Sequence, residues 1–98
     1  MLRTIADRLA TAKKPILKVL FRNKNTRIVA LGIKKGMKLV DHQLPVATKI
    51  ILLKGVMEID SKIEVIVLEE YQNYEIPPKV IHQVRVHEDA IALLVLDF

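Results

Sequence analysis

The chain has 98 residues, of which 51% are hydrophobic and 28% are charged, and its formal net charge is +5. This length suits one domain, and no apolar run reaches the about 20 residues that a membrane helix needs. Cysteine and tryptophan are absent and aromatic residues amount to 4%, which excludes disulfides, thiolate metal sites, a cysteine nucleophile and an aromatic platform for single-stranded nucleic acid. Because Arg3, Asp7 and Arg8 interrupt any secretory apolar core, we expect one cytoplasmic domain over residues 1–98 that binds neither membrane nor nucleic acid.

The first residues predict a short N-terminal helix within residues 1–14. Apolar side chains recur at helical spacing at Leu2, Ile5, Ala6, Leu9 and Ala10. Asp7 and Arg8 fall on the other side of the predicted helix, and Pro15 prevents its continuation.

The remainder, residues 15–98, predicts an all-β barrel. From Ile16 onward the hydrophobic period changes to two and β-branched residues become frequent, as is typical of strands. The predicted strands cover residues 16–22, 26–33, 37–42, 47–54, 56–60, 63–68, 73–76, 80–86 and 90–97. Short strands at this spacing, with no helix between them, favour a sandwich or barrel over an α/β sheet.

Two of the predicted strands are apolar on both faces. They contain residues 50–53 and 90–96, in which neighbouring side chains point to opposite sides of the sheet. A single barrel has one interior, so the outer apolar side chains need a cover, either the N-terminal helix or a second copy of the chain. We therefore expect a homodimer. The same surface also allows the domain to be an interaction module for a partner protein.

The charges are divided unevenly along the chain. Residues 1–54 hold 13 Lys and Arg against Asp7 and Asp41, a net +11, whereas residues 55–98 have a net charge of −6. Such a division can mark a basic binding face. A fold that interleaves the two halves mixes the signs, and we expect most of the asymmetry to cancel in this way.

The glycines and histidines between residues 36 and 86 fall into two regular spacing patterns. The first motif, G-x5-H-x-H-x3-E-x6-G, has its spacing reproduced at Gly36, His42, Leu44, Thr48 and Gly55. The second motif, G-x5-P-x-G-x2-H-x3-N, has its spacing reproduced at Tyr71, Pro77, Lys79, His82 and Val86. Both are motifs of the cupin superfamily, which this sequence resembles over residues 36–86. The resemblance implies a cupin-type double-stranded β-helix, a jelly-roll barrel, preceded by the short α-helix.

The cupin resemblance also implies where a metal would bind. The family's site uses three histidines and one glutamate to hold Fe, Mn, Zn or Ni, and this sequence keeps only His42 and His82 of those four. Leu44 and Thr48 occupy the other two motif positions. A catalytic zinc generally takes three protein ligands, and a non-haem iron oxygenase takes two histidines and a carboxylate. We therefore expect no metal and no other cofactor.

These observations favour a barrel that binds or senses a small organic ligand without catalysis. Its predicted pocket combines the two histidines with a polar hydroxyl and apolar walls, and is formed by His42, Leu44, Thr48, Ile50, Leu52, His82 and Val84. The alternative is a metal-dependent cupin enzyme, an oxygenase or isomerase that uses His42 and His82.

Ser61 is the only serine and lies in a predicted hairpin, so a Ser-His-Asp hydrolase is excluded. Tyr71 and Tyr74 are interpreted as packing residues beside a turn.

Overall fold

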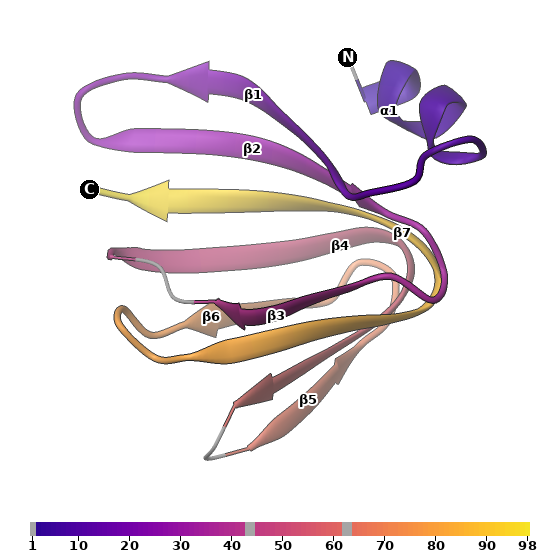
Figure 1. Ribbon diagram of the computed structural model, residues 1–98. Coiled ribbons are helices and arrows are strands. Elements are labelled where there is room, and N and C mark those ends of the chain that lie inside the picture. The colour runs from indigo at the N-terminus through magenta and orange to yellow at the C-terminus, as the bar shows by residue number, and fades with distance from the viewer. Residues whose placement is uncertain (1, 43–44, 62–63) are drawn as a thin grey trace.

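The computed structural model describes residues 2–42, 45–61 and 64–98, and for residues 39–42 it describes the backbone only. Within these ranges the chain forms α1 (Leu2–Leu9), β1 (Ile16–Arg22), β2 (Thr26–Ile33), β3 (Lys38–His42), β4 (Ala47–Ser61), β5 (Val65–Leu68), β6 (Asn73–Ile76) and β7 (His82–Asp97). The prediction of an all-β fold with one short N-terminal helix is confirmed (Figure 1). The helix ends at Leu9, earlier than the predicted range of 1–14.

Strands β4 and β7 are longer than the sequence predicts. The two strands predicted before and after Gly55 form one strand of 15 residues, and the two predicted around the segment 87–89 form one strand of 16 residues. Turn-forming residues bend these strands without ending them, because the backbone ladder between β4 and β7 continues past the bend with register shifts between Leu52 and Met57.

The two long strands connect two layers of sheet. In the first layer β7 pairs with β2, which pairs with β1, and the first half of β4 pairs with β6. In the second layer the start of β7 pairs with β3, and the end of β4 pairs with β5. All of these pairs are antiparallel. Figure 1 shows β4 and β7 curving from one layer into the other, which is how a jelly roll closes around a single interior.

The bend depends on Gly55. Its φ angle is +94°, a left-handed conformation that side chains disfavour, and an added Cβ atom would lie 2.4 Å from the carbonyl oxygen of Asp89 and 2.9 Å from the Cα atom of Ala90. The backbones of β4 and β7 therefore touch at this point with no room for a side chain. The last glycine of the first motif thus closes the barrel.

The space between the layers is filled by aliphatic side chains. Twelve buried residues form one cluster: Leu31, Ile33, Ile50, Leu52, Met57, Ile59, Leu68, Ile76, Val84, Val86, Ala90 and Ala92. They come from both layers and alternate along each strand with outward-facing residues, as a strand with one buried face requires. Burial of this set is the main stabilising contribution to the fold.

Helix α1 covers one end of the outer face of the first layer. Ile5 and Leu9 are 1% and 4% exposed, and a Cβ atom on Gly32 of β2 would lie 2.7 Å from Cγ2 of Ile5. The Lys34 ammonium donates a 2.6 Å hydrogen bond to the carbonyl oxygen of Ala10 just after the helix. Of the residues that the structure describes, none forms a helix long and apolar enough to cross a membrane.

The remaining outer face of this layer is the surface at which we expect a second copy of the chain to bind. Strand register places Ala30, Leu93 and Ile51 side by side on β2, β7 and β4, on the face opposite the core, and Leu93 and Ile51 are only partly buried. We expect a dimer by size-exclusion chromatography with light scattering, and Leu93→Lys should weaken it about tenfold or more because a charge would enter an apolar contact. Val67→Lys, at a 52% exposed position on β5, is the control. A wild-type chain that stays monomeric at high micromolar concentration would contradict the prediction.

Candidate functional site

The two histidines of the motif-like spacing lie on neighbouring strands. In the ladder between β3 and β7, the Cα atoms of His42 and His82 are register partners, although 40 positions separate them in the sequence. The His42 side chain and Leu44 lie outside the part of the chain that is described. The backbone therefore brings the two motif positions together at one end of the barrel.

His82 is an inward-facing, buried side chain. It is 3% exposed, and its Nδ1 atom lies 3.1 Å from the carbonyl oxygen of Val80. A carbonyl oxygen can only accept a hydrogen bond, so Nδ1 carries a proton and donates a hydrogen bond to the carbonyl oxygen of Val80. In the neutral imidazole the Nε2 atom then has a lone pair and can accept a hydrogen bond.

A small cavity of about 50 Å³ lies beside His82. Its wall combines four polar with four apolar residues: Ser61, Glu64, Tyr74, His82, Ile59, Ile76, Pro77 and Val80. Drug-sized ligands occupy pockets of roughly 300–1,000 Å³, whereas one water takes roughly 30 Å³. The cavity therefore has room for a small polar head group, and the rest of any ligand would lie outside it.

A short hydrogen bond at the cavity joins Tyr74 of β6 to Glu64, which precedes β5. The Tyr74 hydroxyl donates a 2.6 Å hydrogen bond to Oε1 of Glu64. This bond to the carboxylate, together with burial and the negative charge of Glu64, raises the pKa of Tyr74 above its usual value of 10.0. The Ser61 hydroxyl and the backbone of Glu64 bond to each other and hold the Glu64 position.

The Tyr74–Glu64 contact makes stability depend on pH in the alkaline range. Because the folded chain holds the phenol proton more tightly than the unfolded chain, this stabilisation is complete below about pH 10 and is lost as the pH rises through the raised pKa. We expect tyrosinate absorbance to show one delayed titration that moves toward pH 10 in Glu64→Gln. Tyr74→Phe identifies the signal by removing it, and an unchanged titration in Glu64→Gln would contradict the assignment.

The predicted pocket residues are distributed between the cavity and the packed core. Of the five whose side chains the structure describes, only His82 lines the cavity. Ile50, Leu52 and Val84 belong to the core cluster and are 1%, 0% and 3% exposed. Thr48 is 2% exposed and donates a hydrogen bond of 3.1 Å to the carbonyl oxygen of Val46. These four therefore face away from bulk solvent, and three of them fill the barrel.

Solved structures similar to this chain share this arrangement of strands. A cupin superfamily protein from Desulfitobacterium hafniense matches with a TM-score of 0.81 and 15% identity, over 88% of this chain and 79% of that one. An RmlC-like cupin family protein with a double-stranded β-helix fold from Methanocaldococcus jannaschii matches with a TM-score of 0.77 and 16% identity, over 88% and 82%. The chain has the cupin fold.

A third similar structure has no assigned activity. It is a conserved protein of unknown function from Streptococcus pyogenes, with a TM-score of 0.77 and 23% identity over 86% of this chain and 74% of that one. No protein-family model matches the sequence, and no curated protein does. The comparisons thus establish the cupin fold and leave the function to the site.

The two positions that are glycine in the second cupin motif have a left-handed backbone in this chain. Tyr71 and Lys79 stand at the two glycine positions of that motif, and both have left-handed φ angles, of 68° and 64°. They are the two non-glycine residues with positive φ in the ranges that the structure covers. At both positions a residue with a side chain therefore holds a strained, left-handed backbone that glycine would adopt freely.

Restoring either glycine should stabilise this cupin barrel. Tyr71→Gly and Lys79→Gly each relieve roughly 1–2 kcal/mol of left-handed strain and add roughly 0.5–1 kcal/mol of unfolded-state entropy, so we expect a net gain near 0.5–1 kcal/mol. Urea unfolding followed by circular dichroism measures it. Glu70→Gly, next to Tyr71 and without positive φ, should lose stability, and equal effects at positions 70 and 71 would contradict the explanation.

The side chains at the metal-binding positions of the two motifs do not fit the metal centre of the cupin family. Among the side chains that the structure describes, no three of His, Asp and Glu lie close enough together to hold a metal ion. The Thr48 hydroxyl, at the glutamate position of the motif, is bonded to Val46, and a neutral hydroxyl is a poor substitute for a carboxylate. Even with His42, the motif positions provide two imidazoles, one fewer than the three protein ligands of a catalytic zinc site.

Proposed function

We propose that this cupin barrel binds or senses a small organic ligand at the cavity beside His82, without catalysing a reaction on it. The observation that carries the proposal is the pairing of Glu64 and Tyr74 at a cavity whose wall is half apolar and which adjoins a filled core. A few convergent polar groups in an apolar wall are the usual form of a recognition site.

The polar atoms at the cavity favour a ligand that donates hydrogen bonds. Tyr74 already uses its proton on Oε1 of Glu64, and Nδ1 of His82 donates to Val80. What remains for a ligand at Glu64 and Tyr74 are oxygen lone pairs and a negative charge. A primary ammonium group complements them in both charge and hydrogen bonding, and its size suits a cavity of about 50 Å³.

A titration with small amines tests the proposal. Ethanolamine should shift the NMR resonances of Tyr74 and His82 saturably, with a Kd near millimolar because so few ligand atoms are enclosed. Acetate, of similar size and opposite charge, should not. Glu64→Gln should weaken binding about tenfold, whereas Glu69→Gln, at an exposed position outside the cavity lining, should not. Shifts that are absent, or that persist unchanged in Glu64→Gln, would refute the proposal.

A further inference from the structure

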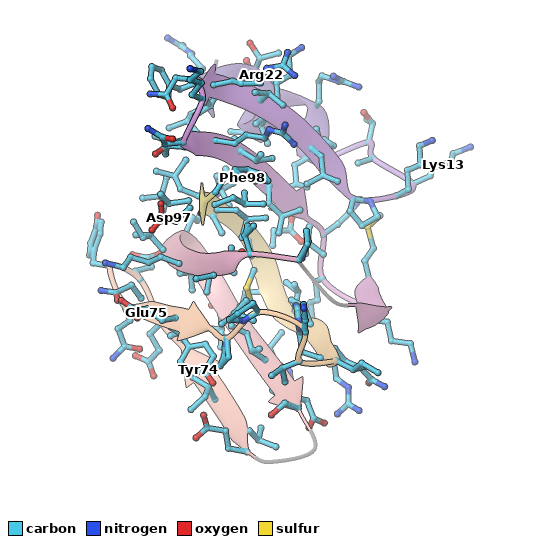
Figure 2. All side chains as sticks on the ribbon, turned by 90° about the vertical axis from the view of Figure 1, so that its left-hand side faces the viewer. Lys13, Arg22, Tyr74, Glu75, Asp97 and Phe98 are labelled. Atoms are coloured by element: carbon cyan, nitrogen blue, oxygen red, sulfur yellow. The ribbon has the colours of Figure 1, made fainter. Side chains whose placement is uncertain are left out.

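The fold keeps a basic and an acidic segment of the chain apart, so part of the charge asymmetry that we expected to cancel remains. Residues 1–24, which contain α1 and β1, hold seven Lys and Arg against one acidic residue, Asp7. Residues 64–76, which contain β5 and β6, hold four Glu and no basic residue. The strand pairings place these two segments on opposite sides of the β2–β7–β4 centre. In Figure 2, Lys13 and Arg22 lie in the upper part of the molecule, and Glu75 lies below them.

The basic side of the molecule contains a groove of about 500 Å³ between the end of α1 and the start of β1. Its lining consists of Arg8, Thr11, Ala12, Lys13, Lys14, Pro15, Ile16 and Leu17. The volume falls within the range of roughly 300–1,000 Å³ that small-molecule sites occupy. It shares no lining residue with the cavity at His82.

The cations of this groove have no ion-pair partner among the side chains that the structure describes. Of the side chains described, no carboxylate lies within 4.0 Å of the charged groups of Arg8, Lys13 or Lys14, since the ion pairs involve Lys49, Arg85 and His87. Carbonyl oxygens at the end of α1 would repel an anion if they were free. Those of Arg8 and Leu9 accept hydrogen bonds from backbone amides, and that of Ala10 accepts one from Lys34. The groove therefore has a net positive charge available to a ligand.

The wall of the groove is apolar on the β1 side. Leu17 is 59% exposed, and Pro15 and Ile16 are partly exposed. A simple inorganic anion would use the cations and leave this surface in water, whereas an apolar molecule would leave the cations unpaired. A ligand with an anionic head and a short hydrocarbon body satisfies both.

We propose that the groove between α1 and β1 binds an amphiphilic anion, an alkyl carboxylate or alkyl phosphate, with its head group on Arg8, Lys13 and Lys14 and its chain on Leu17. The anionic head can belong to a free metabolite or to a lipid, and the two sources share this chemistry. The inference is independent of the function proposed for the His82 cavity.

Calorimetric and NMR titrations with octanoate and octyl phosphate test this site. Both should bind saturably, and Lys13→Ala combined with Lys14→Ala should weaken them about tenfold or more. Leu17→Ser should weaken both ligands, and the pair Lys24→Ala and Lys79→Ala, outside the groove, should not. Octanol and inorganic phosphate, which each lack one half of the chemistry, should bind at least tenfold more weakly than octyl phosphate.

Vesicles distinguish the two sources of the anion. Co-sedimentation with phosphatidylglycerol vesicles that is lost in the Lys13/Lys14 variant assigns a lipid head group, and octanoate binding without co-sedimentation assigns a free ligand; both results support the site. Octanol binding as tightly as octanoate, or binding of the alkyl anions that the Lys13/Lys14 and Leu17 variants leave unchanged, would overturn it. Because these groups are exposed, the variants should fold, and circular dichroism checks that they do.

Discussion

Gly55→Ala is expected to lower the free energy of unfolding by more than about 3 kcal/mol, a large part of the 5–15 kcal/mol that a domain usually has. A methyl group would lie 2.4 Å from the Asp89 carbonyl oxygen and 2.9 Å from Ala90 Cα. Both neighbours are backbone atoms of β7, so relief requires the two long strands to separate at the bend. The φ of +94° adds left-handed strain of roughly 1–2 kcal/mol. Urea unfolding monitored by circular dichroism measures the loss.

Gly36→Ala is the matched control for this prediction. Gly36 has a similar left-handed φ of +89°, but among the described residues, apart from its chain neighbours, no atom lies within 4 Å of the position that its Cβ would take. Its cost is therefore conformational strain alone, about 1–2 kcal/mol. The difference between the two variants isolates the contact with β7. Equal losses at Gly36 and Gly55 would show that the approach of the strands is looser than the structure indicates.

The sequence predicts most of the fold because its strand signals are local. Hydrophobic patterning and β-branched content predict a strand at each segment where the structure describes one, and the Leu2–Leu9 helix follows from its apolar spacing. What the pattern does not give is the continuity of β4 and β7. A glycine such as Gly55 is equally typical of a turn that ends a strand and of a bulge within one. Its close approach to Asp89 across the barrel shows that the strand continues through a bend. The order of the strands in a jelly roll followed instead from the resemblance of the glycine and histidine spacing to the two cupin motifs.

The candidate site is less predictable because its contacts are not periodic. Spacing singled out His82, and the structure buries it beside the cavity. Glu64, in contrast, bonds to Tyr74 across ten positions that include strand β5 and the connection to β6. A single Glu before a strand has no distinctive pattern. Alternation also predicts that Ile50 and Leu52 point inward. Whether inward-facing side chains line a void or fill it depends on summed volumes in three dimensions, which no residue spacing encodes.

Leu52→Ala distinguishes a filled barrel from one with a ligand space at its centre. Leu52 is 0% exposed and belongs to the core cluster. In a filled barrel the truncation removes buried methyl groups and leaves a cavity, so we expect a loss of about 3–5 kcal/mol in urea unfolding with little change in the denaturant slope. The new cavity would be apolar and dry, and should admit xenon or benzene, which would restore part of the stability.

Val65→Ala provides the comparison, since Val65 is 56% exposed on β5 and the same kind of truncation there should change stability by less than about 0.5 kcal/mol. If Leu52 lined a space that a ligand normally occupies, its truncation would cost the free barrel less than about 1.5 kcal/mol, because few packing contacts would be lost. Ligand affinity would change instead. The expected pattern is the reverse, with a large loss of stability at Leu52 and unchanged ethanolamine binding at the Glu64–Tyr74 cavity, because a packed centre leaves recognition to that end of the barrel.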